Sequence, residues 1–535
     1  AQLVIIGCGL FLVFCVWASI MQISATNEKG ENFSGMSAVE VMKNTQKKIE
    51  LTQENVNDIV GRYLKYISDP GTNSESETYH YLSEEVYRTF YLPNRELLSL
   101  VTNVYREPGS GSSIKEVLEE NKQAYIQRLM DLIAIDTHDL GHGIAGGLEK
   151  QGQEYMVKLF EDMGADSIRR DPMTEEAIKE CLAKYQEGNI GHNYDDRYNV
   201  YAVFKGDKDG RSLMFNGHID TMPAGNENEW NTPPHTPTMK DGRLYGLGAA
   251  DMKGGLMASV MAVQLLKDAG IKLPGDVHIT SVCDEEGGGN GSMAAIMSGE
   301  KADGVVVCEP SSDELILAHM GFVFFKVEFE GKANHSGAKW KGVSAIDKAF
   351  KVIRELEELE HKWLLTYKHP LLPAPNLNIG TIHGGSAGST VPGHCYFETC
   401  IHYLPRQMSY DQIVEEFTDA VNRVADSDLW LCRHRPVITM YQAGGAFEQE
   451  SDDSFVACFM DGYEKALGRQ VRLVGSPAGC DSRLWKNIAG CPTMQFGPGR
   501  LEECHAVNEY VEAESYLEAI LVYAQLILEW CKANK

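Results

Sequence analysis

The sequence lacks several common signatures, and each absence excludes a class of protein. None of the 13 cysteines belongs to a Cys-x-x-Cys pair, which excludes a zinc ribbon and a thioredoxin-type redox motif. A Walker motif is absent, and the dinucleotide-binding fingerprint fails because Asp251 replaces its third glycine, after Gly246 and Gly248. Basic residues are scarce, with 49 Lys and Arg against 76 Asp and Glu and a formal net charge of -27. This balance argues against nucleic acid or an anionic membrane surface as the main partner.

The chain does contain enough apolar sequence for a large core. With 535 residues, of which 43% are hydrophobic and 23% charged, we expect two or three domains and exclude a disordered chain. The cysteines are odd in number and scattered, and several lie beside polar motifs. This usage favours a reducing compartment, and hence the cytoplasm, over a disulfide framework.

The N-terminal segment is the exception to this soluble character. Residues 3–23 carry no charge and are long enough to span a bilayer. Three interpretations remain open: a membrane anchor, a truncated signal segment, or residues upstream of a true start at Met36. The segment lacks the basic region that begins a secretory signal. If it is genuine, the protein is membrane-anchored or exported instead of cytoplasmic.

The rest of the chain divides into three parts by its patterns. Residues 36–112 are polar and helix-prone, with turn-forming breaks, and predict a helical extension. Helices and strands alternate over 113–314 and again over 442–535, which predicts an α/β domain with a largely parallel sheet. Between them, residues 315–441 show the order strand-helix-strand-strand-helix-strand, typical of a ferredoxin-like sandwich. We therefore expect a small α+β domain inserted into a larger α/β domain.

The elements behind this prediction are bounded by turn residues or by changes in hydrophobic periodicity. The expected strands are 199–205, 211–216, 276–282, 304–308, 315–330, 376–383, 395–404 and 435–441. The expected helices are 113–135, 252–268, 344–361 and 409–425.

Polar residues follow the expected strands where the strands end, which is where open α/β sheets bind ligands. His218 and Asp220 follow one strand, Glu285 and Glu286 a second, and Glu309 a third. Two further residues lie in loops before helices: Asp251 in a glycine-rich turn, and His505 before the final helix.

Two histidines and several carboxylates at one rim suit a pair of divalent metal ions. Zinc, manganese and cobalt accept imidazole and carboxylate ligands, and a carboxylate can bridge two metals. Asp220 is close enough in sequence to hold the second nitrogen of His218. Each residue alone also has an ordinary explanation, such as a helix N-cap for Asp251 or a solvated loop for Glu285 and Glu286. Their joint occurrence at successive strand ends favours the metal site.

Five motifs, in this order, resemble the M20 metallopeptidase family. They are His218-Ile-Asp220-Thr-Met-Pro223, Gly246-x-Gly248-x-x-Asp251-Met-Lys-Gly-Gly, Asp284-Glu285-Glu286-Gly, Cys308-Glu309-Pro310 and His505-x-x-Asn508-Glu509. The resemblance covers residues 114–535. It implies a phosphorylase/hydrolase-like catalytic domain with a parallel-rich sheet and an inserted ferredoxin-like lid and dimerisation domain. The family includes acetylornithine deacetylase, succinyl-diaminopimelate desuccinylase, aminoacylase and glutamate carboxypeptidase.

The resemblance also assigns the metal ligands. It implies that His218 and Glu309 hold one metal, that Glu286 and His505 hold the other, and that Asp251 bridges them.

The same resemblance implies three catalytic roles. Glu285 would be the general base, which takes a proton from the attacking water and later delivers it to the leaving amine. Asp220 would orient His218. His335 matches a family histidine that reaches the reacting carbonyl across a dimer interface.

The expected substrate contacts depart from the family pattern. The loop with Asp481 and Arg483 matches a family Gly-x-Asp-x-Arg loop near the substrate. Ser389, however, stands where the family commonly has Asn, and His402 stands where it has an Arg that grips the substrate carboxylate. Because His cannot reproduce the bidentate clamp of Arg, we expect altered α-carboxylate recognition, or its takeover by Arg406.

The sequence thus predicts a hydrolase with two divalent metal ions, zinc or else cobalt or manganese, that cleaves the amide bond of an N-acyl amino acid or small peptide. A dipeptidase or aminopeptidase on the same fold is one alternative. A non-catalytic binding protein is another, disfavoured because every expected ligand is present. The expected partners are a small-molecule or short-peptide substrate and a second copy of the chain, joined through the inserted domain.

Overall fold

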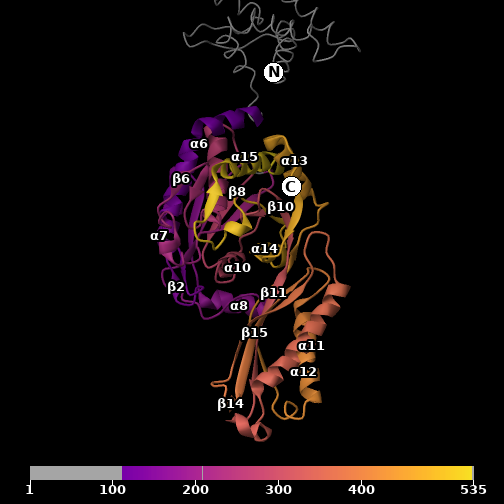
Figure 1. Cartoon of the computed structure of the whole chain (residues 1–535). Coiled ribbons are helices and arrows are strands. Elements are labelled where there is room, and N and C mark those ends of the chain that lie inside the picture. The colour runs from indigo at the N-terminus through magenta and orange to yellow at the C-terminus, as the bar shows by residue number, and fades with distance from the viewer. Residues whose placement is uncertain (1–110, 208, 533–535) are drawn as a thin grey trace, which may run out of the picture. The chain divides into compact units, whose positions relative to one another are not determined.

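The computed structural model of the chain describes residues 111–207 and 209–532. The apolar segment 3–23, Met36 and the helical extension predicted before residue 111 lie outside this part. Within it, none of the helices has the length and apolar character needed to cross a membrane. Two sheets and the helices packed on them make up most of the described chain (Figure 1).

The larger sheet has nine strands in the order β17-β10-β19-β9-β5-β8-β4-β3, and β18 also pairs with β10. Its four central strands, β19, β9, β5 and β8, run parallel to one another, and β4 and β10 flank them antiparallel. The strands are β3 (Ser167–Pro172), β4 (Tyr198–Phe204), β5 (Leu213–His218), β8 (Val277–Val282), β9 (Val305–Val307), β10 (Leu315–His319), β17 (Phe447–Glu448), β18 (Leu473–Ser476) and β19 (Thr493–Gln495). The predicted parallel-rich α/β sheet is confirmed.

Helices cover both faces of this sheet because its central strands are apolar on both faces. Along β5, Leu213 and Phe215 join the main core with α6, α7, α9, α13 and α15, whereas Met214 packs on the other side near α10 and α14. The helices are α6 (Gly111–Ile133), α7 (Lys150–Asp162), α8 (Glu175–Tyr185), α9 (Lys253–Asp268), α10 (Asn290–Met297), α13 (Ser454–Leu467), α14 (Ser482–Asn487) and α15 (Ala513–Trp530).

Two small sheets connect the loops near the strand ends. The sheet β20-β7-β6 joins the segment before the Asp251 turn to the segment after His505, so these two distant loops are neighbours. The other sheet pairs β1 with β2. Their strands are β1 (Asp139–Leu140), β2 (Gly146–Gly147), β6 (Thr238–Lys240), β7 (Arg243–Tyr245) and β20 (Tyr510–Glu512), and short helices lie at η2 (Glu227–Glu229) and η4 (Leu501–Glu503).

The smaller four-stranded sheet has the order β13-β15-β11-β16, all antiparallel, with α11 and α12 packed on it (Figure 1). Along the chain its elements follow the order βαββαβ, so the predicted ferredoxin-like insertion is confirmed. Phe325 of β11 stacks on Phe417 of α12, with ring centroids 4.2 Å apart. The elements are β11 (Gly321–Glu330), β12 (Asn334–His335), η3 (Ser336–Lys341), α11 (Ala345–Thr366), β13 (Asn376–Gly384), β14 (Thr390–Val391), β15 (His394–Tyr403), α12 (Tyr410–Ser427) and β16 (Val437–Gly444).

The single strand predicted over 315–330 is wrong. The chain forms two strands, since β10 ends at His319 and β11 begins at Gly321. β10 belongs to the large sheet and β11 to the small one. β10 is buried on both faces, whereas β11 alternates between buried and half-buried residues. The two strands therefore differ in burial, but they follow each other in one apolar stretch of sequence, which made them look like a single strand.

Candidate metal centre

His218 closes β5 with a fully buried imidazole. Its Nδ1 lies 2.9 Å from the backbone oxygen of Asp220, so Nδ1 carries the hydrogen of this bond and Nε2 is left as the ligand atom. Nε2 lies 3.2 Å from Oδ1 of Asp251 and 3.6 Å from Oε1 of Glu309.

Asp220 contacts His218 through its main chain more closely than through its side chain, whose Oδ1 is 3.8 Å from Nδ1. The other carboxylate oxygen accepts the backbone N–H of Glu286 at 3.1 Å. Asp220 therefore connects the loop after β5 to the loop after β8.

Asp251 lies between the two histidines. Its Oδ1 is 3.2 Å from Nε2 of His218, and its Oδ2 is 3.3 Å from Nε2 of His505. His505 is half exposed and also lies 3.0 Å from Oε2 of Glu286. One carboxylate thus faces both imidazoles, as a bridging ligand must.

Glu285 and Glu286 face the same buried space from the loop after β8. Burial and the negative charges of Asp481 and Glu309 raise the pKa of Glu285 well above its usual range. Burial and the charge of Asp251 raise the pKa of Glu286 to about 7. These carboxylates repel one another at close range, so the group favours added positive charge.

The donor set therefore fits divalent metal ions. Two groups of three side chains have ligand atoms within 4.8 Å of one another: His218, Glu285 and Glu309, and His218, Asp251 and Glu286. Imidazole and carboxylate donors without thiolate suit zinc, manganese or cobalt. The five residues predicted as metal ligands come together, with Glu285 beside them.

Glu509 supports the cluster from behind. Its fully buried carboxylate accepts the backbone N–H groups of Gly248, Ala250 and Asp251 at 2.8, 2.8 and 3.0 Å. Sequence reasoning assigned no role to Glu509, although its position in the last motif was a signal. Glu509 therefore fixes the turn that carries Asp251, the residue between the two histidines.

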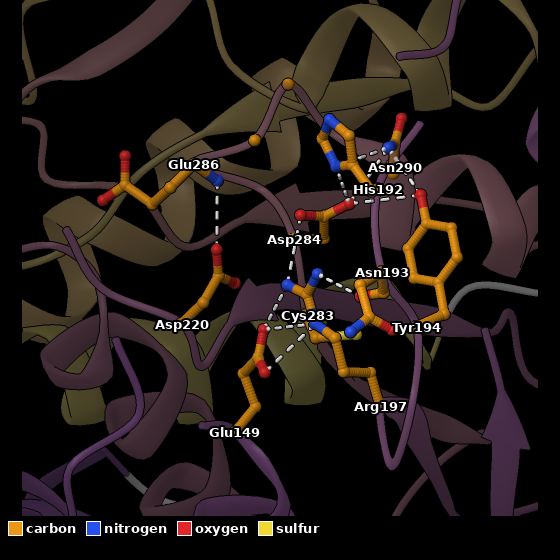
Figure 2. A network of polar contacts seen from close by, with 12 residues as sticks. Glu149, His192, Asn193, Tyr194, Arg197, Asp220, Cys283, Asp284, Glu286 and Asn290 are labelled. Carbon is orange, nitrogen blue, oxygen red and sulfur yellow. Dashed lines mark hydrogen bonds and ion pairs between the residues drawn. The ribbon is translucent and has the colours of Figure 1, made fainter. Parts of the chain in front are cut away.

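A second support lies under the Glu285–Glu286 loop and is centred on Asp284, whose φ of 62° is in the left-handed region. Its carboxylate lies 2.8 Å from Nδ1 of His192 and accepts Nδ2 of Asn290 at 3.0 Å and Nη2 of Arg197 at 3.1 Å. Figure 2 shows these side chains converging on Asp284.

Arg197 links this network to a further buried carboxylate. Its Nε donates to Oε1 of Glu149 at 3.1 Å, and both side chains have no more than 1% exposure. Sequence reasoning missed this ion pair because its members share no motif and lie far apart in the chain.

The predicted substrate residues Asp481 and Arg483 are buried next to the cluster. The guanidinium of Arg483 donates to the backbone oxygens of Cys480 at 2.8 Å and Gly288 at 3.0 Å, and to Glu187 at 3.3 Å. Arg483 therefore braces the loop after Glu286, and its donors are already engaged.

His402 and Arg406 contact other residues than the metal-binding candidates. His402 lies in β15 with Nε2 3.5 Å from Sγ of Cys400, and burial lowers its pKa. Arg406 pairs with Glu448 and Glu450, both at 2.8 Å. Neither side chain lines the cavity that contains the metal-binding candidates.

His335 and Ser389 lie together on the inserted domain, where both are exposed. The backbone oxygen of Ser389 accepts the N–H of Ser336 at 2.8 Å, and β12, with His335, pairs with β14. Nδ1 of His335 accepts the backbone N–H of Gly337 at 3.1 Å. Among the described residues, no contact joins His335 or Ser389 to the metal-binding candidates.

A cavity of about 280 Å³ opens onto the cluster. It is lined by Asp251, Glu285, Glu286, Glu309, Pro310, Ser476, Ala478, Gly479, Cys480, Gln495, Leu501, Cys504 and His505. Four of the five candidate ligands and Glu285 therefore share one solvent-accessible space, whereas His218 is fully buried and does not line it.

Comparison with known proteins identifies the family of the chain that carries this site. The model of "Peptidase family M20/M25/M40" matches residues 214–529. The chain belongs to this peptidase family. It is therefore a metal-dependent amide hydrolase, and the predicted family is confirmed.

Among curated M20 relatives, the chain is 32% identical over 390 residues to an N-formyl-4-amino-5-aminomethyl-2-methylpyrimidine deformylase of Bacillus subtilis, covering 67% of this chain and 90% of that protein. It is 33% identical to a deformylase of the same description from Halalkalibacterium halodurans, covering 72% and 96%. An acetylornithine deacetylase of Vibrio parahaemolyticus is 29% identical, covering 60% and 81%.

Solved structures show the same fold at lower identity. A di-peptidase from Saccharomyces cerevisiae has a TM-score of 0.60 at 14% identity, covering 80% of this chain and 99% of that one. A tripeptidase from Staphylococcus aureus has a TM-score of 0.58 at 21% identity, covering 77% and 98%.

Proposed function

We propose that this M20 enzyme uses two divalent metal ions, most simply zinc, to hydrolyse the amide bond of a small N-acyl compound. The observation that carries the proposal is the carboxylate of Asp251, which faces His218 with one oxygen and His505 with the other. His218 and Glu309 would hold one ion, Glu286 and His505 the other, and Asp251 would bridge them. Bound divalent ions polarise an amide carbonyl and lower the pKa of water.

Glu285 is the proposed general base. It lines the same cavity as the metal-binding candidates, and burial with nearby negative charge raises its pKa, which suits a group that must accept a proton. Glu285 takes the proton of the attacking water and returns it to the nitrogen of the leaving amine. Asp220 keeps Nε2 of His218 directed into the site through its backbone oxygen.

His335 is the proposed donor to the carbonyl oxygen, acting in the active site of a partner subunit. Because its Nδ1 accepts a backbone N–H, the neutral ring carries its hydrogen on Nε2. That N–H can stabilise the negative charge that develops on the carbonyl oxygen. The exposure of His335 supports a role toward a second copy of the chain, and we propose a homodimer formed through the inserted domain.

The proposed substrate does not depend on an α-carboxylate clamp. Arg483 is engaged with Glu187 and two backbone oxygens, and Arg406 with two glutamates. His402 is half-buried with a lowered pKa, so it is neutral near pH 7. The relatives described as a deformylase and a deacetylase support a formyl or acetyl amide.

A dipeptidase or aminopeptidase is the second candidate. The solved di-peptidase and tripeptidase share the fold, and such an enzyme would require a free amine in its substrate. We also propose a cytoplasmic location, which the free cysteines of the described chain support.

Metal analysis followed by a substrate screen tests the proposal. The purified protein is stripped with chelator, reloaded with Zn²⁺, Co²⁺ or Mn²⁺, and assayed on N-formyl and N-acetyl amines, with and without an α-carboxylate, and on dipeptides. We expect about two metal ions per chain and hydrolysis of the N-acyl amines. Hydrolysis of dipeptides alone would favour the second candidate, and full activity after chelation would contradict metal dependence.

A further inference from the structure

A second cavity, of about 410 Å³, adjoins the catalytic cavity. Pro310, Ser476 and Leu501 line both cavities. Pro310 follows Glu309 directly, and Leu501 lies in η4 shortly before His505. The two cavities are therefore neighbours that share these three residues, and the second begins beside two of the proposed metal ligands.

The walls of the second cavity are mixed, and one part of them is aliphatic. Ile316 of β10, Leu371, and the β18 residues Leu473 and Val474 line it. Its volume lies within the range of about 300–1,000 Å³ that is usual for small-molecule sites. The space is larger than a formyl or acetyl group needs.

The charged residues of the second cavity carry an excess negative charge. Glu314 and Arg472 form an ion pair, so their charges balance. Glu502 also lines the cavity and has no ion-pair partner among the described residues. A ligand with a carboxylate in this space would meet the unpaired charge of Glu502, whereas a neutral or cationic one would not be repelled.

We propose that the second cavity binds the part of the substrate that extends beyond the scissile amide, and that it selects an aliphatic extension with a neutral or positively charged end over one with a carboxylate. This inference rests on the proposed amide hydrolysis and specifies its substrate class. The enzyme then prefers amides that are extended on the acyl side or on the amine side over the shortest ones, and a succinyl-type group is a poor extension. The catalytic residues act on the amide while Ile316, Leu473 and Val474 hold the distal chain.

Two substrate series measure the preference in the metal-loaded full-length enzyme. In the first, one amine carries acetyl, butanoyl, hexanoyl, 6-aminohexanoyl or succinyl groups. In the second, the acetyl group is fixed and the amine is lengthened in the same steps. We expect kcat/KM to rise by up to about fourfold for each buried methylene group in one series, and the carboxylate-ended compound to be at least tenfold poorer than the neutral compound of equal length.

Two variants connect the preference to the cavity. Val474→Trp fills the space, and in the series that shows the preference we expect the ratio of kcat/KM for the six-carbon compound to that for the shortest compound to fall at least tenfold. Glu502→Lys reverses the unpaired charge, and the ratio of kcat/KM for the carboxylate-ended compound to that for the neutral compound of equal length should rise at least tenfold in the same series. Met239→Trp is the matched control, because Met239 is 41% exposed on β6 and lines neither cavity, so both ratios should stay as in the wild type.

The outcomes separate this inference from the proposed function. Hydrolysis of the acetyl compound without any length preference, or ratios unchanged in both Val474→Trp and Glu502→Lys, overturns the second cavity as a substrate site. If Val474→Trp does not fold, the exposed Glu502→Lys decides alone. If the wild type hydrolyses no amide in either series, the proposed function fails and this inference fails with it.

Discussion

Glu509 accepts the backbone N–H of Asp251 at 3.0 Å with Oε1, while its Oε2 accepts the N–H of Gly248 at 2.8 Å. The carboxylate thus fixes the backbone of the residue that lies between His218 and His505. Both oxygens are used as acceptors, which a carboxylate can do and an amide cannot.

We predict that Glu509→Gln weakens metal binding about 10- to 100-fold, the usual effect of losing a partner that orients a ligand. The NH₂ group of Gln would face a backbone donor, and the turn would shift. Metal content after dialysis against metal buffers measures the affinity, and excess metal should restore part of kcat. Glu512→Gln is the control, since Glu512 is half exposed on β20. Normal metal affinity in Glu509→Gln would contradict this role.

The ion pair between Arg197 and Glu149 gives a stability prediction. Arg197→Met leaves Glu149 and Asp284 buried without their cation, which should lower the free energy of unfolding by about 3–5 kcal/mol. The control is Arg170→Met, which breaks an exposed pair with Glu154 and should cost about 0–1 kcal/mol.

Denaturant unfolding measures both variants and also Arg197→Met combined with Glu149→Met. The double variant should be more stable than Arg197→Met alone, because it removes one of the uncompensated buried charges. Equal losses for Arg197→Met and Arg170→Met would show that the buried network adds no stability.

The proposed role of His335 predicts complementation between inactive chains. A His335→Ala chain and a Glu285→Ala chain are each expected to be nearly inactive as homodimers. Mixed dimers contain one site with both residues intact, so mixing should recover up to about a quarter of wild-type activity when the chains exchange at random. Light scattering measures the oligomeric state alongside the assay, and a fully active monomer would exclude the idea.

Asp428 of the inserted domain predicts a pH dependence of stability. Burial acts to raise its pKa, but Lys348, Lys351 and two backbone N–H groups outweigh burial and hold it well below the ordinary value of 3.8. Because the folded state binds the proton less readily than the unfolded state, Asp428 stabilises the fold above about pH 5, and this contribution is lost as the pH falls below about 4.

Asp428→Asn should therefore be less stable than the wild type at pH 7 by about 1.5–3 kcal/mol, the range for hydrogen bonds to a charged group. The difference should shrink as the pH falls toward 3. Urea midpoints across this range measure it, with Asp426→Asn, which breaks a more exposed pair with Arg435, as the control. A difference that does not change with pH would contradict the assigned pKa.

The metal-binding candidates were predictable because each lies in a short motif, either at a strand end or, for Asp251 and His505, in a loop before a helix. β5, β8 and β9 are adjacent and parallel, so residues that follow them meet at one edge of the sheet. The ferredoxin-like insertion was predictable because hydrophobic residues recur with a clear helical period in its two helices and alternate with polar residues in its strands. The boundary between β10 and β11 at Met320 was not predictable, because a buried strand and a half-buried strand follow each other in one apolar run.

The supporting residues could not be found from local sequence. Arg483 matched a substrate motif, but its guanidinium is buried against Glu187, which lies 296 residues away. The partners of Asp284 include Arg197, 87 residues away. Such pairing depends on the complete fold, which brings distant loops together under the Glu285–Glu286 segment.

The central claim is that Glu285 transfers protons while its neighbour Glu286 binds metal. The most direct measurement compares Glu285→Gln and Glu286→Gln by metal content and by turnover of the best N-acyl substrate. Glu285→Gln should keep nearly all of its metal and lose at least about 10²–10⁴ in kcat, because Gln cannot accept the proton. Glu286→Gln should lose metal, and part of its activity should return in excess metal. Full activity in Glu285→Gln, or the two phenotypes exchanged, would contradict the account.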